Sequence, residues 1–190
     1  MKISTTPKHI LDFDVETISA GFADPNWVPQ RITVIAWSWI GSREVRYATR
    51  RDTAASMFIE FLKDLRMADM VTGHNLIRFD LPVLNADLIR TGFSALPTLM
   101  VQDTMRVPKA KGLKKGQDNM ARLMGVRARK RNMDWQEWDE AYEWDDLIAG
   151  GDVSWAKVIE RCVTDVKQHK LMRKAMLEEG LLKPPVEWKS

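Results

Sequence analysis

The chain has 190 residues, of which 45% are hydrophobic and 29% charged, a composition typical of one globular domain that excludes disordered and collagen-like chains. Its single cysteine excludes an intramolecular disulfide and a cysteine-rich zinc cluster, and its three histidines argue against a histidine-rich metal site. A metal ion bound to this chain would therefore need oxygen ligands.

The first half of the chain begins with strands and then alternates helices with strands. Apolar runs bounded by turn residues predict strands at residues 10–15, 32–40, 45–48 and 70–72. Between the last two strands, apolar residues recur at spacings of three and four over residues 54–65, which predicts an amphipathic helix capped by Asp52 or Thr53. A second helix is expected from about residue 79 to residue 90.

The second half predicts one more strand and two more helices. Residues 99–104 form an apolar run typical of a strand, and residues 117–124 form a short helical pattern that ends at Gly125. A long helix is expected over residues 154–179 and ends at Gly180. Three strands followed by alternating helices and strands predict an α/β fold with a mixed sheet.

The sequence predicts one domain and no membrane segment. No internal repeat, low-complexity tract or Pro-rich linker divides the chain, so we expect a single domain over residues 1–190 with a short C-terminal tail from about residue 181. The longest stretches without a charged residue fall well short of the roughly 20 residues that a membrane-spanning helix needs. Asp12 precedes any apolar run long enough for a secretory signal, so we expect a cytoplasmic location.

The net charge of +3 conceals two oppositely charged segments. Residues 106–131 contain ten Lys or Arg residues and one acid, whereas residues 134–146 contain seven acids and no base. The basic segment is either a solvated face or a binding surface for phosphates. The acidic segment interleaves carboxylates with Trp135, Trp138 and Trp144, which favours packing or a protein contact over base stacking.

The string LDFDVET ends the first predicted strand. Side chains two apart in a strand share a face, so we expect Asp12, Asp14 and Glu16 to point the same way. Carboxylates on one face of a buried strand need neutralisation, and with no set of His or Cys ligands nearby a divalent cation is the first candidate. Solvent-exposed acids at a strand end are the alternative, because Asp-x-Glu alone is a weak signal.

Two further strings place acids on helices. In TGHNLIRFDLPVL, Asp80 begins a helix and Asn75 lies in the turn before it, where a helix cap and a turn former are the simpler roles. In IERCVTDVKQHKLM, Asp165 lies inside the last helix among apolar residues, although Asp is a poor mid-helix residue. An ion pair with Arg161 or His169, each four positions away, is the alternative to a functional role.

Taken together, LDFDVET, GHN followed after three residues by FDLPVL, and the late CVTDV resemble, in order and spacing, the three motifs of the DnaQ-like, or DEDD, 3′-to-5′ exonucleases. The segment VQDTMRVPKAKGLKKGQDNMARLMGV also resembles the family's Asp-Thr strand, basic loop and short helix. The resemblance covers residues 10 to about 176 and is nearest to the proofreading exonuclease domain of B-family DNA polymerases. It implies a ribonuclease H-like fold, an α/β mixed five-stranded sheet flanked by helices.

The resemblance implies a metal-dependent 3′-to-5′ exonuclease that hydrolyses phosphodiester bonds at the 3′ end of DNA, preferably single-stranded, and releases nucleoside 5′-monophosphates. Its two divalent cations, Mg²⁺ or Mn²⁺, would be held by four carboxylates, namely Asp14, Glu16, Asp80 and Asp165. Three positions match residues that lie around the terminal nucleotide in the family, namely Thr17, Asn75 and Phe79. In the basic segment, the candidates for contacts with the nucleic-acid backbone are Lys109, Lys111, Lys114 and Lys115.

One position departs from the family pattern. The family carries a Tyr four residues before the last Asp or a His five residues before it, and this residue orients the attacking water; here the positions hold Arg161 and Glu160. Arg cannot act as a base, because its guanidinium stays protonated and has no acceptor. We therefore expect Arg161 to pair with a carboxylate or with the scissile phosphate as part of the catalytic site.

Two other functions remain open at this point. No motif in the sequence encodes contacts with a 2′-hydroxyl, so a 3′-to-5′ exoribonuclease fits the motifs as well as an enzyme acting on DNA. Arg161 leaves room for a weakly active or inactive family member that serves as a nucleic-acid-binding module. The four intact carboxylates favour the enzyme.

Overall fold

The computed structural model describes residues 7–18, 31–51, 53–107, 116–128 and 152–190. Its strands are β1 (Ile10–Ile18), β2 (Arg31–Trp39), β3 (Arg46–Thr49), β4 (Met70–Gly73), β5 (Leu99–Asp103) and β6 (Val186–Trp188). Its helices are α1 (Ala54–Leu65), α2 (Asp80–Arg90), α3 (Gln117–Leu123) and α6 (Asp152–Glu178). All five strands and all four helices expected from the sequence are present.

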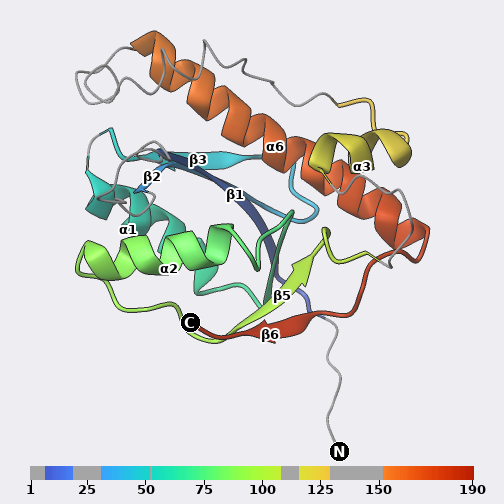
Figure 1. Ribbon diagram of the computed structural model, residues 1–190, viewed down its shortest axis with the longest axis horizontal. Coiled ribbons are helices and arrows are strands. Elements are labelled where there is room, and N and C mark those ends of the chain that lie inside the picture. The colour runs from blue at the N-terminus through green and yellow to red at the C-terminus, as the bar shows by residue number, and fades with distance from the viewer. Residues whose placement is uncertain (1–6, 19–30, 52, 108–115, 129–151) are drawn as a thin grey trace, which may run out of the picture.

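The strands form one mixed sheet in the order β3-β2-β1-β4-β5-β6. Strands β1 and β4, and β4 and β5, pair in parallel, whereas the other neighbours are antiparallel. Helices α1 and α2 cover one face of the sheet, and α3 and α6 cover the other (Figure 1). This arrangement confirms the α/β fold with a mixed sheet flanked by helices.

Within the described part of the chain the sheet has six strands, where five were expected. The sixth, β6, pairs antiparallel with β5 and places Trp188 opposite Leu99. It lies within the segment that the sequence analysis treats as a tail from about residue 181. With three residues that directly follow Pro184-Pro185, β6 is too short to show the alternating pattern by which a strand is recognised in a sequence.

Strand β1 contributes side chains to both layers of helices. Its odd-numbered residues from 11 to 15 are buried in the larger apolar core with residues of α1 and α2. Its even-numbered residues from 12 to 16 all contact α6, through His169, Cys162 and Arg161 respectively. The shared face predicted for the three acids of β1 is therefore confirmed, and that face meets α6.

Helix α6 packs on the sheet through an apolar stripe. Its buried residues Trp155, Val158, Cys162 and Val166 pack against Val34 and Ala36 of β2. This stripe fixes the rotation of α6 about its own axis, so the polar residues beside it lie over β1. Among the described residues, none of the helices has the length and apolar character of a membrane-spanning segment.

Candidate metal centre

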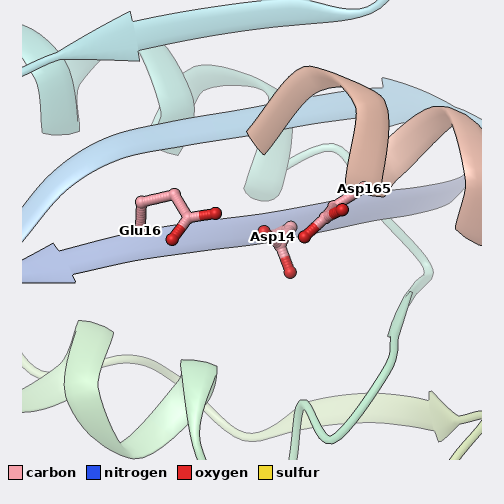
Figure 2. A group of neighbouring side chains, drawn as sticks. All are labelled: Asp14, Glu16 and Asp165. Atoms are coloured by element: carbon pink, nitrogen blue, oxygen red, sulfur yellow. The ribbon is translucent and has the colours of Figure 1, made fainter. Parts of the chain in front are cut away.

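Three carboxylates meet where β1 passes under α6. Asp14 and Glu16 come from β1 and Asp165 comes from α6, and one oxygen of each lies within 4.8 Å of the others. Figure 2 shows the three side chains between the strand and the helix. Glu16 is 8% exposed and Asp165 is 2% exposed, so much of this negative charge is removed from water. These three residues are named the acid cluster below.

The donor set of the acid cluster fits a hard divalent cation. Carboxylates held this close in a buried position repel one another, and a cation between them removes the repulsion. Mg²⁺ and Mn²⁺ prefer carboxylate oxygens, and the three residues provide such oxygens from two elements that the core holds in place. The acid cluster is therefore chemically suited to bind metal ions.

The thiol of Cys162 lies beside the acid cluster. Its Sγ is 3.4 Å from the backbone oxygen of Asp14 and 3.7 Å from Oδ2 of the same residue. Burial, together with the charges of the acid cluster, raises the pKa of this thiol well above its usual range. The protonated thiol is a weak donor to Asp14, and it is not the thiolate that a metal site would require.

Arg161 reaches into the acid cluster from α6. Its Nε donates to Oε1 of Glu16 at 2.8 Å, and only 17% of its side chain is exposed. Burial lowers the pKa of the Arg161 guanidinium, but the negative charges of Glu16 and the other cluster acids outweigh that effect and raise it. The predicted pairing of Arg161 with a carboxylate is therefore observed, and the partner is Glu16. Glu160, the neighbouring position of the motif, is exposed.

Asp80 lies next to the acid cluster but is not one of its three members. It is 3% exposed at the start of α2, and its Oδ1 accepts a hydrogen bond from the backbone N–H of Val15 at 3.2 Å. Burial raises the pKa of Asp80 to about 7, and the charges of Asp103 and Glu16 add to the effect. Asp80 is thus held at β1 with a carboxyl group that ionises near neutral pH.

The three residues predicted to surround a terminal nucleotide lie on β1 and before α2. Asn75 has a positive φ of 66° in the turn after β4, a conformation that Asn tolerates better than most residues. Phe79 precedes α2 and packs partly against the larger core. Thr17 follows Glu16 on β1 at an irregularity in the pairing with β2. The structure is compatible with the simpler roles of core residue and turn residue for Phe79 and Asn75.

The turn that carries Asn75 is held by Asp103, which the sequence indicates only as the Asp of the Asp-Thr strand and not as a site residue. Oδ1 of Asp103 accepts from the backbone N–H of Asn75 at 2.9 Å, and Oδ2 accepts from that of Ile77 at 3.1 Å. Gly73, which precedes the turn, has no room for a side chain, because an added Cβ would lie 2.9 Å from the backbone oxygen of Phe13. The signal available in the sequence is the Asp-Thr pair at residues 103–104, at the end of a predicted strand.

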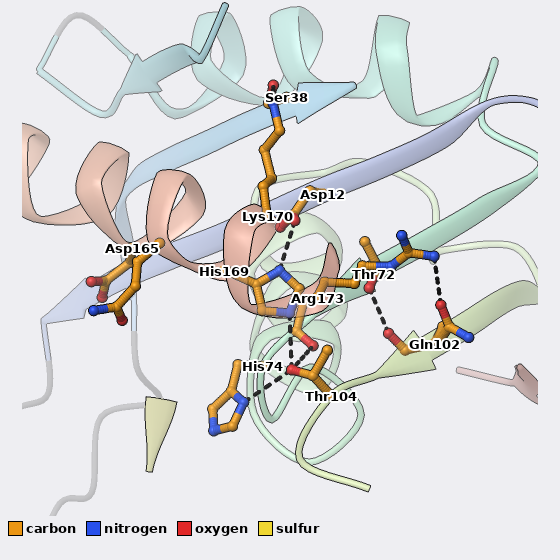
Figure 3. Close-up of polar contacts among 12 residues, drawn as sticks. Asp12, Ser38, Thr72, His74, Gln102, Thr104, Asp165, His169, Lys170 and Arg173 are labelled. Carbon is orange, nitrogen blue, oxygen red and sulfur yellow. Dashed lines mark hydrogen bonds and ion pairs between the residues drawn. The ribbon is translucent and has the colours of Figure 1, made fainter. Parts of the chain in front are cut away.

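Asp12, the third acid of β1, is buried against a protein partner, so neither the divalent cation nor the exposure to solvent considered for this face from the sequence applies to it. His169 of α6 places Nδ1 2.6 Å from Oδ2 of Asp12, and its Nε2 lies 2.9 Å from the hydroxyl of Thr104 (Figure 3). The same hydroxyl lies 3.0 Å from Nδ1 of His74. Both ring nitrogens of His169 are thus occupied away from Asp165, so the suggested ion pair between His169 and Asp165 is not what the structure shows.

Several predicted contacts lie outside the described residues. The lysines proposed to contact the nucleic-acid backbone are Lys109, Lys111, Lys114 and Lys115, and all four fall within residues 108–115. The acidic segment with Trp135, Trp138 and Trp144 falls within residues 129–151. The described residues do not test these predictions, which therefore stay predictions.

Comparison with known proteins finds a solved structure with a similar fold. No protein-family model and no curated protein matches the chain. Among solved structures, the fold is similar to that of the family B DNA polymerase from the hyperthermophilic archaeon Pyrobaculum calidifontis, with a TM-score of 0.59 and 20% sequence identity. The match covers 89% of this chain and 24% of the polymerase chain. The protein thus has the α/β fold of one part of a B-family DNA polymerase and spans about a quarter of that polymerase's length.

Proposed function

We propose that this protein is a 3′-to-5′ exonuclease that hydrolyses phosphodiester bonds at the 3′ end of single-stranded DNA and releases nucleoside 5′-monophosphates. The observation that carries the proposal is the acid cluster, which joins the first and the last DnaQ-like motif although they lie about 150 residues apart. The fold of a B-family polymerase region supports it, because the resemblance of the motifs leads to the proofreading domain of the same polymerases.

The proposed metal ligands are the acid cluster and Asp80. The resemblance implies two ions, Mg²⁺ or Mn²⁺, which would neutralise the scissile phosphate and make a water molecule acidic enough to attack it. Asp14 and Glu16 of β1 and Asp165 of α6 would hold the ions, because one oxygen of each lies within 4.8 Å of the others. Asp80 joins them when it is ionised, and its pKa of about 7 places that change near neutral pH. Ligand binding therefore competes with protonation at this residue.

Other residues would bind the substrate. Arg161 donates hydrogen bonds inside the site and cannot accept a proton, so its proposed role is to stabilise negative charge on the phosphate as the bond breaks. The proposed contacts with the terminal nucleotide come from Thr17, Asn75 and Phe79. The proposed contacts with the backbone of the strand come from Lys109, Lys111, Lys114 and Lys115.

One structural observation favours a second candidate. Because Arg161 already pairs with Glu16, a ligand of the proposed metal centre is engaged by a protein cation. A weakly active or inactive protein that binds single-stranded nucleic acid would also have this arrangement. An exoribonuclease remains the third possibility, and the choice between RNA and DNA depends on contacts with the 2′-hydroxyl.

Digestion of 5′-labelled oligonucleotides separates these functions. Single-stranded DNA and RNA of the same sequence are incubated with the protein in Mg²⁺, in Mn²⁺ and in EDTA. The proposal expects a ladder of products shortened from the 3′ end, formed with either metal, absent in EDTA and faster on DNA. Faster digestion of RNA would identify an exoribonuclease. An oligonucleotide that binds to the protein but is not digested would identify a binding module.

A further inference from the structure

The hydroxyl of Thr104, directly after β5, has three polar contacts in the interior of the protein. Thr104 is 1% exposed. Its Oγ1 lies 3.2 Å from the backbone oxygen of Gly73, 3.0 Å from Nδ1 of His74 and 2.9 Å from Nε2 of His169. A hydroxyl can donate one hydrogen bond and accept two, so these contacts use its whole capacity. Figure 3 shows the hydroxyl between the two imidazole rings.

The three contacts come from two parts of the molecule. Gly73 and His74 lie where β4 leads into the turn before α2, whereas His169 lies on α6. His169 is itself fixed, because its Nδ1 lies 2.6 Å from Oδ2 of buried Asp12 on β1. Thr104 therefore connects the turn after β4 to a side chain of α6 that the sheet already holds.

The two parts that Thr104 connects carry different components of the proposed site. The turn after β4 carries Asn75 and leads to Phe79, two of the three proposed contacts with the terminal nucleotide. Helix α6 carries Asp165 of the acid cluster about one turn before His169. The placement of the nucleotide relative to the metal ligands therefore depends on how the turn is held against α6.

Such placement matters for hydrolysis, because reacting groups must be held within about 0.5 Å of the productive geometry. A displacement of about 1 Å can lower a rate roughly a hundredfold. Asp103 holds the backbone of the turn through the N–H groups of Asn75 and Ile77. Thr104 adds a contact with the side chain of His74 and joins it to α6.

We infer that Thr104 is a positioning residue of the proposed exonuclease: its hydroxyl keeps the turn that carries Asn75 aligned with α6, so that the terminal nucleotide reaches the acid cluster. The inference rests on the proposed function. Thr104 is buried, so it acts through His74 and His169 and not by contact with the substrate.

Two substitutions at Thr104 test the inference by steady-state kinetics on a single-stranded DNA oligonucleotide. Thr104→Val keeps the size of the side chain and removes the hydroxyl. It should lower kcat roughly tenfold to a hundredfold with little change in KM, because the proposed contacts with the backbone of the strand remain. Thr104→Ser keeps the hydroxyl and should restore most of kcat. A hydroxyl with a purely structural role would change the stability of the protein but not the kcat of the folded variants.

The matched control is Thr72→Val. Thr72 of β4 is also buried, and its hydroxyl donates to the backbone oxygen of Gln102 on β5 at 2.7 Å. This variant therefore loses a buried hydroxyl beside the same pair of strands, but it should keep the kcat of the wild type. Thermal denaturation in EDTA establishes that each variant is folded at the temperature of the assay.

A fluorescent base at the 3′ end reports the placement of the terminal nucleotide without catalysis. A single-stranded oligonucleotide that ends in 2-aminopurine, whose emission depends on its surroundings, is bound to each protein in EDTA. We expect the same change of emission on binding for the wild type, Thr104→Ser and Thr72→Val. The change should be smaller for Thr104→Val, in which the turn is no longer tied to α6.

If Thr104→Val does not fold, the same contact can be removed from the turn. His74 is half-buried, and His74→Leu takes away the nitrogen that meets the hydroxyl, so kcat should fall as expected for Thr104→Val. His74→Asn, whose side-chain amide occupies the place of Nδ1, should keep most of kcat.

The outcomes that overturn the inference are distinct from the one that overturns the proposed function. Wild-type kcat in Thr104→Val, an equal loss of kcat in Thr104→Val and Thr72→Val, or no recovery in Thr104→Ser would refute the positioning role and leave the proposed exonuclease standing. Wild-type kcat in His74→Leu would do the same. A wild-type protein that digests no oligonucleotide would refute the proposed function, and the inference with it.

Discussion

Asp12 and Asp14 lie two residues apart on the same face of β1, yet their surroundings differ. Asp12 is 1% exposed and lies 2.6 Å from His169, with the positive charges of Lys170 and Arg173 nearby. Asp14 belongs to a group of three carboxylates, and Arg161 donates a hydrogen bond to one of them, Glu16.

The comparison shows which carboxylates of a buried strand have a structural role and which are available for chemistry. At Asp12, burial raises the pKa of the carboxyl group, and the charges of Lys170 and Arg173 offset this only in part. The carboxyl group is held by its contact with His169, and the pair contributes to the attachment of the helix. At the acid cluster, three carboxylates lie together beside the guanidinium of Arg161, and this group of oxygens suits a divalent ion. Both regions use the same helix, one turn apart.

The largest expected effect is the loss of cleavage on removal of a cluster carboxylate. Asp14→Asn or Asp165→Asn should lower turnover roughly a hundredfold to a thousandfold, because several kcal/mol of transition-state stabilisation depend on the bound cation. Single-turnover digestion of a 5′-labelled single-stranded oligonucleotide measures the loss. Asp69→Asn, at an exposed acid outside the site, is the control and should cleave normally. Normal cleavage by either cluster variant would remove the acid cluster from the mechanism.

At the other region, substitution should affect stability before activity. Asp12→Ala removes the hydrogen-bond partner of buried His169 and should lower the free energy of unfolding by about 1–3 kcal/mol, as is usual when a buried polar group loses its partner. Urea denaturation in EDTA measures this change, and Mn²⁺ binding by the folded variant should be retained. An unchanged urea midpoint would mean that Asp12 is not held as the structure shows.

The raised pKa of Asp80 predicts a dependence of stability on pH in the metal-free protein. The folded protein binds a proton at Asp80 up to pH about 7, whereas the unfolded chain releases it near pH 3.8, so this contribution to stability is present below pH 3.8 and is lost as the pH rises to 7. When the pH is raised from 5 to 8, the wild type should therefore lose roughly 2.5 kcal/mol of unfolding free energy relative to Asp80→Asn, which has no proton to release at this position. Urea denaturation in EDTA at the two pH values measures it, and parallel behaviour of the two proteins would disprove the shift.

A smaller effect is expected at Arg161. Arg161→Ala should lower turnover roughly tenfold, since a positive charge directed at the phosphate is lost while the cluster carboxylates remain. Arg161→Tyr restores the residue type that the resemblance implies and should keep or raise turnover. Steady-state kinetics on the two variants decides the matter: if Arg161→Ala turns over like wild type, Arg161 forms a structural ion pair only.

The smallest effect concerns the basic segment. If Lys111 and Lys114 contact phosphates, replacing both with Gln should reduce the slope of log affinity against log salt by about 1.4, which is roughly 0.7 for each phosphate contact on a single strand. Fluorescence anisotropy of a labelled oligonucleotide over a range of salt concentrations measures the slope. Equal slopes in variant and wild type would indicate that the basic segment is a solvated face and does not contact phosphates.

Local periodicity was sufficient to predict much of the fold and the element on which each acid of the acid cluster lies. The alternation along β1 predicts that Asp14 and Glu16 share a face, and the apolar spacing around Asp165 predicts its place inside a long helix. Both patterns repeat within a few residues, so they are visible without knowledge of the rest of the chain. The resemblance to the DnaQ-like motifs then predicted that the acids of these two elements form one metal site.

The partner of Asp12 could not be predicted in this way. Asp12 and His169 are separated by 157 positions, and only the packing of α6 on the sheet decides which basic residue lies over which acid. From the sequence, Asp12 had no partner of its own: it was grouped with Asp14 and Glu16, for which a cation or exposure to solvent was considered, and His169 was considered for Asp165, its neighbour one turn away. Strand β6 was missed for a related reason, because its three residues gain their structure from pairing with β5.

Thermal denaturation with and without Mn²⁺ tests most directly the central claim that the acid cluster, and not the Asp12 pair, binds the divalent cation. Mn²⁺ at about a hundred times its dissociation constant should raise the melting temperature of the wild type by roughly 5 °C or more over its value in EDTA. The same rise is expected in Asp12→Asn, and no rise is expected in Asp165→Asn. A rise of equal size in Asp165→Asn, or no rise in the wild type, would contradict the account.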